Sequence, residues 1–324
     1  MREKRLTGDA ARLGGKLAAA YAGIIFVVFI WGIYPVLAAG LLEHYSGGAF
    51  SLTGALISAS VLTLLSVPKL GQIDRRYFAA ALPTGFFVAA ANLLQKIGLR
   101  FTTPARYAFL ENLSCVVVPF LLFLLIRKKP RIPTLAAAFL CLCGCFVLSG
   151  PVISSGGAPG VGEILCAAAG LLYGVNIAST GVYAKKLDAM LYVMLQTWVS
   201  VAVSGAGAFA LDRISAGGEP VERFVFSADP GHILLLAALA LAVSTLGWII
   251  RTEAMKYVNP SAVAVIMPFS SVVTGVAAVI VGRDVFSANL LLGGLIILIS
   301  SIVSGVGDAR DNRDSSGETE RKEQ

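Results

Sequence analysis

Several carboxyl and amide side chains stand inside long apolar stretches of the chain, where polar groups are costly. Glu111 and Asn112 occupy one such stretch and Asn92 the one before it. A helix that starts near Pro104 carries Glu111 about 10 Å along its axis, well inside a membrane. An ionisable group there costs about 2.5–3.5 kcal/mol, so it usually faces a cavity or a partner. We expect Asn92, Glu111 and Asn112 to form one polar layer, in which Glu111 either takes up a proton or pairs with a cationic group of a solute.

A purely structural role for Glu111 is the alternative. Its carboxylate could pair with Lys96 or Arg106, or accept a hydrogen bond from Tyr107 one turn back. Gln95 and Lys96 lie one turn nearer the surface than Asn92. The two roles predict different partners for the same carboxylate.

Aromatic residues with a polar atom suit the wall of a cavity that handles a partly apolar solute. Arg251 and Glu253, at the end of a later apolar stretch, are either a gate or interfacial charges. Helix packing or lipid contact is the alternative for each aromatic residue. The candidate substrate-binding residues are Trp31, Tyr34, Asn92, Gln95, Glu111, Asn112, Tyr173, Asn176, Trp248 and Arg251.

The composition specifies what kind of element carries these residues. Of the 324 residues, 56% are hydrophobic and 14% are charged, and the mean hydropathy is +0.79. That is more apolar surface than a soluble core of this size buries, so we predict an all-α polytopic membrane protein. Ten transmembrane helices are expected at 17–41, 48–68, 77–99, 103–126, 133–151, 161–183, 189–211, 232–252, 259–282 and 286–306.

The net charge of +7 is distributed unevenly between the connections of these helices. Lys and Arg concentrate before residue 17 and in alternate connections, such as Arg75 with Arg76 and Lys185 with Lys186. The positive-inside rule places that face in the cytoplasm. The sequence therefore predicts a multi-pass protein of the cytoplasmic (inner) membrane with both termini in the cytoplasm, and no nucleic-acid partner.

No residue set has the pattern of a catalytic or metal centre. The five cysteines fall in predicted spans, and Cys141, Cys143 and Cys145 alternate in a way that scatters them around a helix. The two histidines, His44 and His232, are expected in or near external loops. We predict neither an enzyme activity nor a cofactor nor a metal site.

The chain repeats itself in degenerate form. The run GLRFTTPARYAFLENLSCVVVPF from Gly98 recurs as AMKYVNPSAVAVIMPFSSVVTGV from Ala254, with Pro104 on Pro260. Each copy contains an odd number of spans, so the second lies upside down relative to the first, as in many secondary transporters. In this alignment Glu111 falls on Met267 and Gln95 on Arg251.

These runs, together with Trp31-Gly32 and its counterpart Tyr173-Gly174, resemble the drug/metabolite transporter superfamily, in its EamA-like branch of two five-helix repeats. The likeness covers about residues 17–306. It implies a central cavity lined by the third, fourth, eighth and ninth spans with the first and sixth. It implies cargoes from amino acids to nucleotide sugars, without naming one.

The chain departs from the family pattern twice. Met267-Pro268 stands where many relatives carry an acidic residue before the proline. Arg283-Asp284 follows Gly282 where they have Gly-Glu. The first change removes a carboxylate from the second repeat, and Asp284 is the remaining candidate for the other. Pro119 and Pro268 are expected to bend their helices.

The resulting prediction is a secondary transporter that moves a small metabolite (an amino acid, sugar or drug-like solute) by alternating access, either proton-coupled or as an exchanger. The partners expected are that solute, the lipid bilayer and, as open options, a coupling proton and a second copy in a homodimer. A scaffold or sensor without transport activity is the alternative, followed by a membrane-embedded enzyme. The predicted segments are a cytoplasmic segment at 1–16, repeats at 17–151 and 161–306, a linker at 152–160 and a disordered cytoplasmic tail at 307–324.

Overall fold

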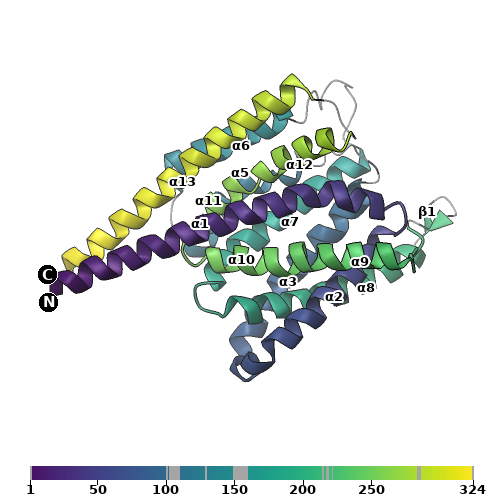
Figure 1. Cartoon of the computed structure of the whole chain (residues 1–324), viewed down its shortest axis with the longest axis horizontal. Coiled ribbons are helices and arrows are strands. Elements are labelled where there is room, and N and C mark those ends of the chain that lie inside the picture. Colours follow the sequence, from purple (N-terminus) through teal and green to yellow (C-terminus); the bar gives the residue numbers. More distant parts are fainter. Residues whose placement is uncertain are drawn as a thin grey trace.

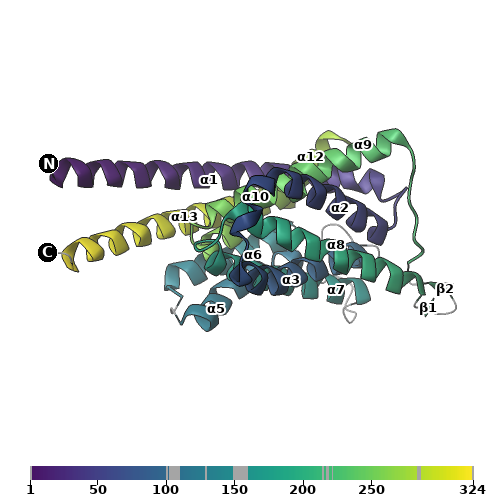
Figure 2. The same cartoon turned by 90° about the horizontal axis from the view of Figure 1, so that it is seen from below.

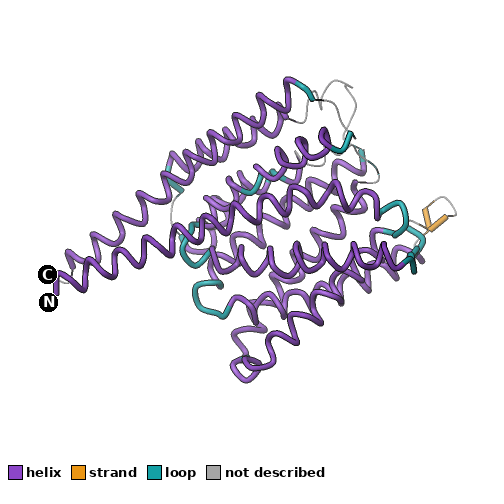
Figure 3. Tube along the Cα trace, in the orientation of Figure 1, coloured by secondary structure: helices purple, strands orange, loops and turns teal. Residues whose placement is uncertain are grey.

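The computed structural model describes residues 2–99, 101, 110–127, 130–148, 160–213, 215–216, 219–220, 222–282 and 286–322. Nearly all of this chain is helical (Figure 3). The elements are α1 (Arg2–Leu41), α2 (Gly47–Ser66), η1 (Val67–Gln72), α3 (Arg75–Leu99), α5 (Ser114–Ile126), α6 (Ile132–Leu148), α7 (Val161–Tyr183), α8 (Ala189–Arg213), β1 (Ser215–Ala216), β2 (Glu219–Pro220), α9 (Pro230–Leu239), η2 (Ala240–Gly247), α10 (Trp248–Ala254), α11 (Pro260–Ile266), α12 (Phe269–Ile280) and α13 (Ala288–Lys322).

The helices form ten spans, which confirms the predicted all-α membrane architecture. In the described residues, eight helical segments are long and apolar enough to cross a membrane, and Ser114–Ile126 and Ile132–Leu148 are two shorter apolar helices. Large apolar side chains cover the outside of the bundle, as shown by Leu124 at 75% and Ile132 at 83% exposure. Such surface is stable only against hydrocarbon.

Three of the ten spans depart from a simple α-helix. The eighth runs from α9 through a π-helical segment, η2, into α10. The ninth is broken at Met267-Pro268, between α11 and α12, as the proline predicts. The fourth breaks at Asn112-Leu113, just before α5. Pro119, by contrast, lies within the continuous helix α5.

The two broken spans correspond to each other. The alignment that pairs Pro104 with Pro260 also pairs Asn112 with Pro268, so both repeats interrupt the same helix at the same point. Residue 104 itself lies outside the described residues. Discontinuous helices in matching positions of two repeats are typical of transporter binding regions.

Helix packing shows the same symmetry: a contact between two helices recurs between their counterparts in the other repeat. Helix α3 packs against α7, and their counterparts, the eighth span and α1, pack likewise. Helix α5 packs against α7, and the counterpart pair α12 and α1 does the same. The corresponding helices α2 and α8 contact each other, as do α6 and α13. With five spans per repeat, this pattern is that of a pseudo-twofold axis in the membrane plane.

Both termini lie at the same end of the molecule, at the left of Figures 1 and 2. In place of the predicted disordered tail, helix α13 continues past Gly307 to Lys322. At the opposite end, the loop after α8 contains a ladder of two short antiparallel strands, β1 with β2.

Candidate functional site

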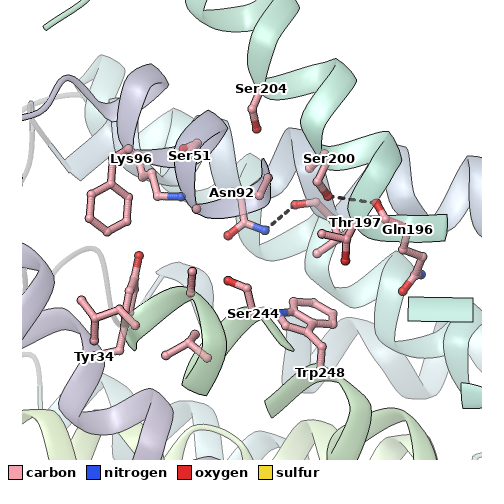
Figure 4. Close-up of a pocket in the computed structure, with 18 of the residues that line it drawn as sticks. Tyr34, Ser51, Asn92, Lys96, Gln196, Thr197, Ser200, Ser204, Ser244 and Trp248 are labelled. Carbon is pink, nitrogen blue, oxygen red and sulfur yellow. Dashed lines mark hydrogen bonds between the residues drawn. The ribbon is translucent and has the colours of Figure 1, made fainter. Parts of the chain in front are cut away.

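A cavity of about 110 Å³ lies between the two repeats. A single water needs about 10–15 Å³ on the same measure, so the cavity has room for a small solute. Its walls come from α1, α2 and α3 of the first repeat and from α8, α9, η2 and α10 of the second (Figure 4). The lining residues are Tyr34, Phe50, Ser51, Gly54, Ala55, Val88, Ala89, Asn92, Lys96, Val193, Gln196, Thr197, Ser200, Ser204, Leu236, Leu239, Ala240, Val243, Ser244 and Trp248.

Most of the polar lining is neutral. None of these lining residues carries a carboxylate, and Lys96 is the one charged side chain among them. The Lys96 ammonium lies 5.5 Å from the ring centroid of Phe50, a cation–π contact. Within the described part of the chain it makes no ion pair, so the pairing with Glu111 considered from the sequence is not formed.

On the first-repeat side, the hydroxyl of Tyr173 joins two amides of α3. It donates towards Asn92 Oδ1 and Gln95 Oε1, at 3.0 Å each. The Asn92 amide also donates to the carbonyl of Val88 at 2.8 Å. Asn92 lines the cavity, and the Tyr173 hydroxyl, outside the lining, holds its amide oxygen.

In the repeat alignment, the counterparts of these three residues are Trp31 of α1 with Trp248 and Arg251 of α10. The two indoles lie 5.4 Å apart, and the Arg251 guanidinium carbon lies 4.2 Å from the Trp248 ring centroid and 5.8 Å from that of Trp31. Trp31 Nε1 donates to the carbonyl of Val243 in η2 at 3.4 Å. The same three positions therefore meet in both repeats, once through an amide cluster and once through a cation between aromatic rings.

Arg251 is an unusual cation because it is only 1% exposed. Its Nη2 donates to Asn176 Oδ1 at 2.7 Å, and its Nε has no hydrogen-bond partner. No carboxylate of the described residues lies within 4.0 Å of it. The hydrogen bond to Asn176 and the stacking on Trp248 are therefore the contacts that hold its charge, in a buried position unlike that of an interfacial arginine.

A polar network that the sequence reasoning missed lies next to Arg251. The Asn176 amide donates to the carbonyl of Thr84 at 3.0 Å. The Thr84 hydroxyl accepts from Tyr192 and from Gln196, each at 2.8 Å. Gln196 reaches the cavity, so the network connects Arg251 to the lining. Gln196 and Thr197 were detectable, since they are adjacent polar residues in an apolar helix.

Glu111 and Asn112 lie at the break of the fourth span and do not line the cavity. The Asn112 amide donates to Ser271 Oγ in α12 at 3.1 Å, so it bridges the two broken spans. Glu111 lies within electrostatic range of the hydroxyls of Tyr34 and Tyr173. The backbone at Leu110 and Glu111 packs closely against Gly170 of α7, where a Cβ would clash with both carbonyls. The predicted single layer is therefore divided, with Asn92 joined to Tyr173 and Asn112 to Ser271.

At the end opposite the termini, the loop after α8 is fastened to the start of α2. The Glu222 carboxylate accepts the N–H groups of Gly47 and Gly48 at 2.9 Å each, as an anion at a helix N-terminus should. Tyr45 donates to the carbonyl of Ser227 at 2.8 Å. Desolvation, reinforced by the nearby Asp229 carboxylate, raises the pKa of Tyr45.

At the end that carries the termini, Asp188 joins the α7–α8 connection to the α2–α3 connection and to the start of α3. Lys69 Nζ lies 2.7 Å from Asp188 Oδ2, and Asp188 Oδ1 accepts from the N–H groups of Met190 and Leu191. The Asp188 N–H donates to the hydroxyl of Tyr77 at 3.0 Å. Burial raises the pKa of Asp188, but the hydrogen bonds from Lys69 and the helix N–H groups outweigh it, so the pKa lies below the ordinary 3.8.

The described residues hold no cluster of three or more His, Cys, Asp or Glu side chains arranged for a metal ion. The five cysteines are free thiols. Arg100, Pro104, Arg106, Tyr107, Arg283 and Asp284 lie outside the described residues.

Six of the ten candidate residues line the cavity or contact its lining directly. Tyr34, Asn92 and Trp248 line it, while Trp31, Tyr173 and Arg251 contact lining residues. Gln95, bonded to Tyr173, and Asn176, in the network through Thr84, are one step further away. The cavity wall includes the second and seventh spans, which the family resemblance did not imply, and none of the described lining residues comes from the fourth, sixth or ninth span, which it did imply.

Comparison with known proteins identifies the family. The model of the EamA-like transporter family matches residues 18–150 and 160–306, one match for each repeat. No curated protein matches the chain. One solved crystal structure, described only as that of a protein, superposes with a TM-score of 0.71 at 14% identity over 90% of this chain and 98% of the other, which shows a shared fold. The chain, with its two matched repeats, belongs to the EamA-like transporter family, a branch of the drug/metabolite transporter superfamily of membrane transporters.

Proposed function

We propose that this chain is a secondary transporter that carries a small metabolite, such as an amino acid, a sugar or a drug-like solute, across the cytoplasmic membrane. The observation that carries the proposal is the polar cavity between the repeats, walled by seven helical elements of both. Buried polar side chains in a membrane are costly and mark solute pathways. The basic residues near the termini favour a cytoplasmic location for both ends.

Alternating access is supported by the ties at the two ends of the cavity. At one end the Glu222 carboxylate is hydrogen-bonded to the start of α2, and at the other end Lys69 forms an ion pair with Asp188. Each tie joins parts of both repeats, so opening one end requires one repeat to move against the other. Inverted repeats supply two such states of similar energy.

Glu111 is the candidate for proton coupling. It sits at a helix break, and its carboxylate is within electrostatic range of Tyr34, which lines the cavity. A proton taken up there changes the charge next to the solute site, and exchange without a proton is the other coupling mode. The small residues Ser200 and Ser204, whose spacing of four also suits helix contact between protomers, line the cavity instead, so they give no support for a homodimer.

A scaffold or sensor without transport activity is the rival function. It gives no reason to keep a solute-sized polar cavity and an arginine that is 1% exposed in the membrane. A membrane-embedded enzyme would need a catalytic cluster, and the described residues offer none with metal-binding geometry.

Reconstitution of the purified chain into liposomes tests the proposal. Wild type should give saturable flux of at least one solute from a panel of amino acids, sugars, organic acids and organic cations. Absence of saturable flux for the whole panel would contradict transport. Single cysteines placed in the 212–231 loop and after residue 307 should react from opposite sides of the membrane.

The coupling role is tested on the transported solute. Glu111→Gln should abolish the pH dependence of flux while the protein still folds, and Glu163→Gln, at the start of α7 and away from the cavity, is the matched control. A Glu111→Gln variant with the pH dependence of the wild type would remove Glu111 from the mechanism.

A further inference from the structure

We propose that the cavity selects a small hydroxylated carboxylate, whose anionic group binds Lys96. This inference rests on the proposed transport function and narrows its substrate class. It comes from the charges and the unused hydrogen-bonding groups of the lining.

The charge of the lining is positive. Lys96 is its one charged member, and the carboxylates nearby are engaged elsewhere. Glu222 accepts two N–H groups at the start of α2. It lies within electrostatic range of Lys96 but forms no direct ion pair with it, and Glu111 does not line the cavity. A solute carboxylate in the cavity supplies the direct ion-pair partner that the Lys96 ammonium lacks.

A second cation strengthens this field. Arg251 stacks on the face of Trp248 that lies behind the cavity wall, and no described carboxylate pairs with it. At low effective dielectric, charges interact over several ångströms more strongly than in water. Lys96 lines the cavity and Arg251 contacts the lining residue Trp248, so both cations act on whatever occupies the cavity.

The unused donors point the same way. The hydroxyls of Tyr34, Ser204 and Ser244 make no hydrogen bond within the described residues, and neither does the Lys96 ammonium. Figure 4 shows Tyr34, Lys96 and Ser244 around the cavity. These groups can donate to a solute, so the solute must offer acceptors, which a carboxylate does best.

Other lining groups have already donated their protons and can only accept. The hydroxyls of Ser51, Thr197 and Ser200 donate to backbone carbonyls of their own helices, at 2.7, 2.8 and 3.1 Å. Their oxygen lone pairs stay available for hydroxyl groups of a solute. A lining with donors around Lys96 and acceptors on α2 and α8 therefore matches a hydroxy acid.

An amino acid fits less well, although it carries the same carboxylate. Its ammonium would enter a cavity whose lining contains no carboxylate and already holds the Lys96 cation. Two like charges in a low-dielectric site repel each other, which disfavours the zwitterion. The cavity of about 110 Å³ also favours a small acid.

Three solutes of nearly equal size separate these features: glycerate (anion), serine (zwitterion) and glycerol (neutral). Binding to the purified full chain in detergent is measured by calorimetry, with gluconate and glucose as a larger pair. We expect glycerate or gluconate to bind at least tenfold more tightly than its uncharged or zwitterionic partner. Equal affinity for serine or glycerol, or no binding of either acid, would overturn the inference.

Variants at Lys96 test the residue itself. Lys96→Gln should weaken binding of the acid at least tenfold, Lys96→Arg should retain most of it, and Lys186→Gln, an exposed lysine outside the cavity, should leave it unchanged. An unchanged affinity in Lys96→Gln would contradict the assignment. The preference of the wild type for glycerate over serine tests the selectivity for an anion without the use of any variant.

The two proposals fail in different ways. Acid binding that depends on Lys96 without flux in liposomes would refute transport and keep the inference. Flux of serine or glucose without acid binding would refute the inference and keep transport.

Discussion

Arg251 stacks its guanidinium on the indole of Trp248, with 4.2 Å between its central carbon and the ring centroid. The counterparts of these residues in the first repeat, Gln95 and Asn92, instead accept hydrogen bonds from Tyr173. The same backbone positions thus place a cation on one side of the cavity and neutral amides on the other. This asymmetry between the repeats gives the site its electrostatic character.

Arg251→Met should leave stability unchanged or raise it. Removal of an unpaired buried charge relieves a penalty of several kcal/mol. Two losses oppose this gain. The Asn176 oxygen left without a donor costs about 1–3 kcal/mol, and the lost cation–π contact costs about 0.5–2 kcal/mol. Thermal unfolding of the purified protein in detergent measures the sum.

The same variant should weaken binding of the transported acid, because one of the two cations is gone. Arg251→Lys, which keeps the charge, is the matched control for this effect. A melting temperature far below that of the wild type would mean that Arg251 is a structural residue instead.

Gly32→Ala should destabilise the bundle, whereas the repeat counterpart Gly174→Ala should not. A Cβ at Gly32 would lie 2.5 Å from Val273 Cβ, in the contact that lets Thr274 donate to the Gly32 carbonyl at 2.7 Å. A Cβ at Gly174 would lie 3.5 Å from its nearest neighbour, an ordinary contact.

Overpacking of this kind costs about 1–3 kcal/mol, while alanine in place of glycine within a helix gains up to about 1 kcal/mol. Thermal unfolding of the two variants under identical conditions gives the comparison. Equal melting temperatures for both would show that α1 and α12 pack more loosely than described here.

The Asp188 tie should lose its contribution to stability only in acid. Because the pKa of Asp188 is lowered by folding, the contribution is complete above the unfolded value of about 3.9 and is lost as the pH falls through the folded value. Stability should therefore be insensitive to this group from about pH 5 upwards and fall below about pH 4.

Two substitutions separate the parts of the tie. Asp188→Asn keeps an oxygen for the N–H groups of α8 and loses the Lys69 ion pair, which is partly exposed and worth about 0–1 kcal/mol. Asp188→Ala loses both and should cost about 1–2 kcal/mol more. Equal stability of the two variants at pH 7 would contradict this division.

Much of the fold could be predicted from the sequence. The prediction of 161–183 coincides with α7 (Val161–Tyr183), because glycine and charged residues mark where that apolar run ends. The breaks were harder. Pro268 predicts the helix break in the ninth span. No residue type near Asn112 breaks a helix by itself, and only the repeat alignment relates the two breaks.

The π-helical segment η2 could not be predicted from the sequence, because one extra residue in a helical turn does not change the apolar composition of the span. It presents Val243 and Ser244 to the cavity. Positions within the site were also beyond reach. Lys96 was considered as a partner of Glu111, yet rotation of α3 directs it into the cavity, and only packing fixes such a rotation.

Filling the cavity tests most directly the claim that it is the transport site. Gly54 lines the cavity, and a Cβ there meets nothing within 4 Å, so a side chain at this position starts in open space and extends into the cavity. Gly71, where a Cβ also meets nothing within 4 Å, lies outside the cavity and provides the control. Flux into liposomes is measured for Gly54→Leu, Gly71→Leu and wild type at matched protein content. The account predicts that Gly54→Leu loses at least 90% of the flux, about tenfold or 1.4 kcal/mol, at an unchanged melting temperature, while Gly71→Leu transports normally. Wild-type flux in a folded Gly54→Leu protein would contradict it.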